Sequence, residues 1–87
     1  MRKRKGLSVV RLRHSRVAQL YDTLIFEQNK DSITLNSGGF RTRHTKNCIN
    51  DLLPDGFRLY QRDFEWYVVN QANEVIPFKD NMILEVE

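Results

Sequence analysis

The sequence predicts an α+β fold, in which one helix packs on a mainly antiparallel sheet of four to five strands. One segment has the apolar spacing of a helix, and five segments have the alternating or β-branched pattern of strands. The chain also begins with cations that lack apolar partners. This start predicts a flexible basic N-terminal arm, residues 1–16, ahead of a single small domain, residues 17–87.

The first 20 residues divide into a charged start and a segment that fits two interpretations. Residues 1–5 include four cations, and we expect them to be disordered. Residues 8–13 suit a strand, whereas Ser15 suits the N-cap of a short helix that ends at Tyr21. The sequence leaves open whether residues 7–20 are strand, helix or disordered.

A hairpin is predicted next. Residues 23–27 are apolar and β-branched at their centre, and residues 28–31 are typical of a turn. Residues 32–36 then alternate, which predicts that Ile33 and Leu35 share a buried face.

The one predicted helix follows Ser37-Gly38-Gly39. Either Thr42 or Thr45 can serve as its N-cap. Its apolar residues recur at helical spacing: Cys48, Ile49, Leu52 and Leu53. Pro54-Asp55-Gly56 is expected to end the helix, because proline cannot continue the hydrogen-bond ladder.

The C-terminal third predicts three or four short strands. Residues 57–62 alternate, so that Arg58, Tyr60 and Arg62 are expected on the face opposite the core. A tight reversal at residues 63–64 and a turn at residues 70–73 would flank a second strand, residues 65–69. Pro77 places the strand of residues 74–78 at a sheet edge, and residues 82–87 fit a final edge strand. The core of this part is expected to include Phe57, Leu59 and Trp66.

The net charge of +3 hides a strong segregation of charge. Residues 1–16 carry +7, residues 17–49 carry +1 and residues 50–87 carry −5. A basic arm on an acidic body is typical of a protein that contacts a polyanion. Two alternatives stay open: a solvated tail, and an arm that folds back on the acidic half of the chain.

The segment around Gly38-Gly39 is the best candidate for an anion site. Glycines allow a close backbone approach, and the first N–H groups of a helix point outward. Arginine forks and threonine hydroxyls nearby match phosphate or carboxylate oxygens. With the arm and the exposed side of residues 57–62, the candidate nucleic-acid or anion-binding residues are Arg2, Lys3, Arg4, Lys5, Arg11, Arg13, Gly38, Gly39, Phe40, Arg41, Thr42, Arg43, Lys46, Tyr60 and Arg62.

Aromatic residues also gather near arginines in the segment of residues 58–67. Such a set on an open sheet can stack nucleic-acid bases and hold phosphates. Most of these aromatic residues are needed for the core of so small a domain, so we expect Tyr60 and Arg62 to be the exposed ones.

Several function classes lack the residues they require. The sequence has no nucleophile elbow, no zinc-protease motif and no P-loop, so we expect no enzyme activity, cofactor or metal. The one cysteine, Cys48, is expected to pack as a small hydrophobic residue. No apolar run is long enough for a membrane helix or a signal peptide, which predicts a cytoplasmic protein that has no membrane partner.

Two segments resemble a group of small uncharacterised proteins of tailed bacteriophages. The first runs from Ser32 to Thr42 (ITLNSGG, an aromatic residue, then RT) with Thr45-Lys46 and Asn50 after it, and the second contains YQ followed by EWYV at residues 60–68. The resemblance covers about residues 23–82 and leaves residues 1–16 outside. It implies expression in the cytoplasm of an infected host cell and an accessory role, and it assigns no residue a function.

Charge and resemblance together favour a non-enzymatic phage accessory protein that binds DNA or RNA through its basic arm and Gly-Gly loop. The alternative is an inhibitor or modulator of a host protein, such as a polymerase, nuclease or defence factor. That protein would dock through the aromatic hairpin and the edge strands. Neither the oligomeric state nor a host target follows from the sequence.

Overall fold

The computed structural model describes residues 4–39 and 41–86 of the chain. This part forms eight strands and one helix, in two sheets. The elements in chain order are β1 (Leu7–Arg11), β2 (Arg16–Leu20), β3 (Thr23–Gln28), β4 (Ser32–Leu35), α1 (Arg43–Leu52), β5 (Arg58–Arg62), β6 (Glu65–Val69), β7 (Val75–Pro77) and β8 (Met82–Glu85). The protein is therefore mostly β.

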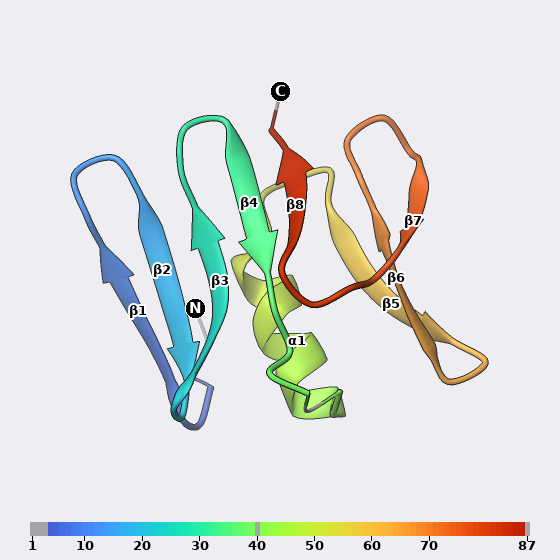
Figure 1. Cartoon of the computed structure of the whole chain (residues 1–87), viewed down its shortest axis with the longest axis horizontal. Coiled ribbons are helices and arrows are strands. Elements are labelled where there is room, and N and C mark those ends of the chain that lie inside the picture. Colours follow the sequence, from blue (N-terminus) through green and yellow to red (C-terminus); the bar gives the residue numbers. More distant parts are fainter. Residues whose placement is uncertain (1–3, 40, 87) are drawn as a thin grey trace.

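The predicted single sheet with a helix on it is wrong. The strands form a five-stranded sheet in the order β1-β2-β3-β4-β8 and a three-stranded sheet in the order β5-β6-β7 (Figure 1). Every neighbouring pair is antiparallel. Two sheets arise because the chain leaves β7 and returns to β4, where the Asn81 N–H donates to the Leu35 carbonyl at 2.8 Å. The final strand thus extends the first sheet and not the second.

The segment from residue 4 onward is folded, whereas the sequence predicts a flexible arm over residues 1–16. Residues Leu7–Arg11 form β1, which pairs with β2 along its whole length. A helix beginning at Ser15 is wrong, because residues 16–20 form β2 and bury Ala18 and Leu20 at the period of two that strands require. Residues 1–3, with the predicted site residues Arg2 and Lys3, lie outside the described residues.

Helix α1 packs against both sheets, so the two sheets share one core. The helix contacts β3 of the first sheet and β5 of the second, and in the view of Figure 1 it lies between these two strands. Cys48 and Ile49 are fully buried, which confirms the predicted packing of the cysteine. Trp66 and Phe78 meet edge to face with ring centres 5.3 Å apart. The expected core residues Phe57, Leu59 and Trp66 are all buried.

Helix α1 begins and ends where the sequence predicts. Thr42 is the N-cap, and its hydroxyl accepts a hydrogen bond from the Thr45 N–H at 3.2 Å. Leu53 is already extended, with a ψ of 136°, because Pro54 disfavours helical geometry at the residue before it. No helix among the described residues is long and apolar enough to span a bilayer.

The reversal between β5 and β6 is a two-residue turn at Asp63 and Phe64. Both residues have positive φ angles, 52° and 68°, as a type I′ turn requires. That turn sets the register of the hairpin, in which Tyr60 lies opposite Tyr67 and Arg62 opposite Glu65. The turn therefore decides which side chains share the outer face of the second sheet.

Candidate functional site

The backbone of the Gly-Gly loop requires glycine. Gly38 and Gly39 have φ angles of 66° and 84°, in the left-handed region that favours glycine. A Cβ atom at Gly38 would clash with the side chain of Thr23, so this turn requires glycine for a second reason.

The N–H groups of this loop already have acceptors within the chain. The Ser37 N–H and hydroxyl both donate to Asp80 Oδ1, at 2.9 and 2.7 Å. The Gly38 N–H donates to Asn36 Oδ1 at 3.1 Å, and the Gly39 N–H donates to Ser37 Oγ at 3.2 Å. The anion beside the loop is therefore the carboxylate of Asp80.

The pKa of Asp80 reflects this loop. Burial acts to raise the pKa of the carboxyl, but the two hydrogen bonds from Ser37, the charge of Arg41 and the Gly39 N–H outweigh it. The net result is a pKa below the usual range of an aspartate. The charge of Arg41, next to the helix start, is thus opposed by a carboxylate of the same chain.

The other predicted residues of this segment have separate roles. The Thr42 hydroxyl is engaged in the helix cap and in a 3.0 Å hydrogen bond with the hydroxyl of Thr45. The Arg41 guanidinium lies 5.3 Å from the centre of the Phe78 ring. Arg43 is exposed and Lys46 is half-buried. Phe40 lies outside the described residues.

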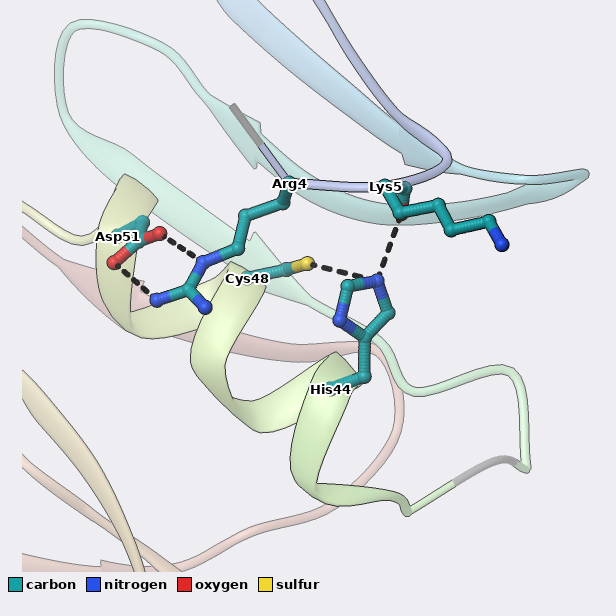
Figure 2. A network of polar contacts seen from close by, with 5 residues as sticks. All are labelled: Arg4, Lys5, His44, Cys48 and Asp51. Carbon is teal, nitrogen blue, oxygen red and sulfur yellow. Dashed lines mark hydrogen bonds and ion pairs between the residues drawn. The ribbon is translucent and has the colours of Figure 1, made fainter. Parts of the chain in front are cut away.

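Part of the basic N-terminal segment folds back on the acidic half of the chain. The Arg4 Nε–H donates to Asp51 Oδ2 at 2.5 Å, and the imidazole Nε2 of His44 lies 2.7 Å from the Lys5 carbonyl (Figure 2). The Asp51 carboxylate raises the pKa of the Arg4 guanidinium. These contacts fix residues 4 and 5 against α1, as one of the open alternatives anticipated.

Cys48 lies on α1 close to these contacts of residues 4 and 5. Its sulfur is 3.9 Å from the Nε2 of His44 (Figure 2). Burial raises the pKa of the thiol, so the cysteine stays protonated near neutral pH. Among residues 4–39 and 41–86, no group of His, Cys, Asp or Glu side chains is placed to hold a metal ion.

Two exposed arginines and two half-buried tyrosines of the second sheet form a separate cluster. Tyr60 and Tyr67 stack with ring centres 5.5 Å apart and an angle of 27° between their planes. The Arg58 Cζ lies 5.5 Å from the centre of the Tyr60 ring, a cation–π geometry. Arg62 is on the same face and is exposed. We call Arg58, Tyr60, Arg62 and Tyr67 the aromatic platform.

Sequence reasoning placed two of these four residues in the site. The alternation of residues 57–62 put Tyr60 and Arg62 on the solvent side, and the structure confirms that Tyr60 and Arg62 share the outer face. Arg58 and Tyr67 are not among the site residues that the sequence predicts. The alternation of residues 57–62 already predicts that Arg58 lies on the same face as Tyr60. Tyr67 joins the cluster only because the turn at residues 63–64 sets it opposite Tyr60.

Comparison with known proteins identifies a family that matches most of the chain. A family model described as Kyanoviridae Gp96 protein covers residues 4–85, which includes residues 4–16 of the basic stretch that the resemblance from the sequence left outside. No curated protein and no solved structure matches the chain.

Proposed function

The chain belongs to the Kyanoviridae Gp96 family, a family of phage proteins, and we propose that it is a non-enzymatic accessory protein that binds single-stranded nucleic acid in the cytoplasm of the infected cell. The observation that carries this proposal is the aromatic platform. Its two tyrosine rings stack on an open sheet face, with an arginine over one of them. This combination suits stacked bases and neighbouring phosphates.

The position of the platform supports this role. Residues Leu59, Trp66 and Val68 point to the opposite face and are buried, so the hairpin keeps its core contacts while the platform faces outward. Both tyrosines are half-buried. Rigid rings need little ordering when a base stacks on them, and such a stack contributes about 1–3 kcal/mol per base.

The platform carries two cations, and two acidic residues lie next to it. Arg58 and Arg62 are exposed cations, whereas Glu65 lies opposite Arg62 and Asp63 is 4.0 Å from the Arg62 Nε. Local attraction for phosphate is therefore modest. Exposed cations elsewhere and the net charge of +3 add a longer-range attraction for a polyanion.

The first test is fluorescence anisotropy with labelled single-stranded DNA, single-stranded RNA and duplex DNA at two salt concentrations. We expect single strands to bind more tightly than duplex DNA, with a log–log salt slope of about −0.7 for each phosphate contacted. Tyr60→Leu removes a stacking ring and keeps apolar bulk, so it should weaken binding by about fivefold or more, which corresponds to about 1 kcal/mol.

The matched control is Tyr21→Leu, because Tyr21 is an exposed tyrosine at the distant β2–β3 turn. It should bind single strands as the wild type does. Equal affinity of the wild type and Tyr60→Leu, or binding that ignores salt, would overturn the proposal.

A second candidate function is modulation of a host protein such as a polymerase, nuclease or defence factor. The observation in its favour is Phe64, which is 92% exposed at the tip of the β5–β6 hairpin. Its φ of 68° is unfavourable for phenylalanine, and its ring contributes almost nothing to the core. A host protein that co-purifies from nuclease-treated lysate with the wild type but not with Phe64→Ser would favour this function over nucleic-acid binding.

A further inference from the structure

Strand β1 is an edge strand that neither a proline nor a bulge blocks. It pairs with β2 on one side, and among residues 4–39 and 41–86 no segment pairs with its other side. The edge strand β7 of the second sheet is only three residues long and contains Pro77. In contrast, β1 pairs through five consecutive residues without a bulge and contains no proline. Proteins generally block such an edge, because it can pair with another chain.

The hydrogen bonds at the two ends of β1 show which of its backbone groups are free. The Gly6 carbonyl accepts from the Tyr21 N–H at 2.8 Å, and the Leu12 N–H donates to the Ser15 carbonyl at 2.8 Å. Along an antiparallel strand, the backbone N–H and carbonyl groups of alternate residues point to the same neighbouring strand. The backbone groups of the even-numbered residues from 6 to 12 therefore point toward β2. The N–H and carbonyl groups of Val9 and Arg11 therefore face outward.

The side chains of this edge offer apolar contacts on both sides of the sheet. Val9, Val10 and Leu12 are 43, 51 and 57% exposed. Val9 lies beside Ala18 on the core side, whereas Val10 lies beside Val17 on the outer side. Alternate side chains of an added strand would thus meet apolar surface on each face.

Charge decides what kind of strand fits. Lys5, Arg11 and Arg13 are exposed along this edge. The ion pairs among the described residues join Arg4 to Asp51 and Arg62 to Asp63. Lys5, Arg11 and Arg13 therefore take part in neither ion pair. Burial, together with the nearby charge of Arg11, lowers the pKa of the Arg16 guanidinium, which is consistent with a positive field at this end of β1.

A second copy of the chain is a poor partner for the same reason. Antiparallel pairing of two β1 strands about Val9 would set Lys5 directly opposite Arg13 of the other copy. Like charges in directly opposed positions destabilise a strand pair. We infer that the free edge of β1 receives an extended acidic segment of a partner protein as a sixth strand of the first sheet.

The start of this edge is held in place before any partner arrives. The contacts of Arg4 with Asp51 and of His44 with the Lys5 carbonyl fix the chain to α1 just ahead of β1 (Figure 2). A strand edge that is already ordered loses less conformational entropy when it binds. This surface lies on a different sheet from the aromatic platform, so its test is independent of nucleic-acid binding.

The probe is a labelled peptide of about eight residues in which Val and Thr alternate with Glu, compared with a peptide in which Lys replaces Glu. The wild type should bind the acidic peptide and not the basic one. Val9→Pro removes an outward-facing N–H and no β1–β2 hydrogen bond, so it should fold and bind the acidic peptide at least about tenfold more weakly.

A second variant tests the charges without proline. Arg11→Glu/Arg13→Glu should lose the acidic peptide and acquire binding of the basic one. In the wild type, hydrogen exchange at the Val9 and Arg11 amides should slow when the acidic peptide binds, while exchange at Val10 changes little.

Three results would overturn the inference. The first is that neither peptide binds the wild type. The second is that folded Val9→Pro binds the acidic peptide as tightly as the wild type. The third is that oligonucleotides displace the peptide and themselves protect the Val9 and Arg11 amides, which would make the edge a polyanion surface.

Discussion

Replacing Asp80 should destabilise the fold, because this acid holds the Gly-Gly loop in place. Ser37 is 1% exposed, and both its N–H and its hydroxyl donate to Asp80 Oδ1. In Asp80→Ala both donors lose their acceptor in a buried position. Hydrogen bonds to a charged group contribute about 1.5–3 kcal/mol each, and water near the exposed carboxylate favours the lower end. We expect the free energy of unfolding to fall by about 3 kcal/mol.

Asp80→Asn separates hydrogen bonding from charge. The amide oxygen can still accept from Ser37, whereas the attraction to Arg41 is lost. We expect a loss of about 1 kcal/mol for this variant. The matched control is Asp31→Ala, because Asp31 is exposed and its side chain forms no hydrogen bond among the described residues. It should change stability by less than about 0.5 kcal/mol.

Urea and thermal unfolding, followed by tryptophan fluorescence and circular dichroism, would measure these differences. For a domain of this size, 1 kcal/mol corresponds to a shift of about 4–8 °C in the midpoint. Asp80→Ala should therefore unfold more than about 10 °C below the wild type. If Asp80→Ala and Asp31→Ala unfolded at the same temperature, the loop would not depend on this carboxylate and the reasoning would fail.

The same acid predicts a pH dependence. The pKa of Asp80 is lower in the folded state, so its charge stabilises the fold at pH values above the unfolded pKa of about 3.9. That stabilisation is lost as the pH falls through the folded pKa, because the unfolded chain takes up the proton at a higher pH than the folded chain does. As the pH falls below about 5, the wild type should lose more stability than Asp80→Asn, and parallel pH profiles would contradict this account.

The remaining predictions concern stability and use the same unfolding assays. Phe64→Gly should raise the free energy of unfolding by about 0.5–1 kcal/mol, because glycine suits the positive φ and the phenyl ring has almost no core contact; a lower stability would show that the ring packs on the hairpin. Asn50→Ala should cost about 2 kcal/mol, because its amide bonds the Leu59 N–H at 2.8 Å and the Leu59 carbonyl at 2.7 Å. Its control, Asn47→Ala, lies on the same helix and should cost clearly less. Thr42→Ala should cost about 1 kcal/mol through the lost helix cap, and Thr42→Ser should restore most of it.

Local structure was largely predictable from the sequence. Alternation in residues 32–36 and 57–62 assigned Ile33, Leu35 and Leu59 to the core, because successive side chains of a strand point to opposite faces. The helix boundaries followed from Thr42 and Pro54, which act on backbone groups within one turn. The short loops followed in the same way from residues that favour turns.

Pairing across the chain was not predictable in this way. Residues 7–11 and 82–85 have patterns that fit several edges, and only the packed core places β8 beside β4 and β1 beside β2. The candidate site depends on the same long-range contacts. Asp80 reaches Ser37 across 43 positions of sequence, and Arg4 reaches Asp51 across 47.

From residue 23 onward, the sequence by itself thus indicated the approximate positions of the strands, the turns and the helix, and which side of most strands is apolar. Those properties depend on backbone preferences and on side chains a few residues apart. The tertiary structure alone decided that the anion beside the Gly-Gly loop is Asp80, that Tyr67 completes the aromatic platform and that β1 has a free edge. Each of these depends on which distant segments meet, and that choice is made by burying one shared core.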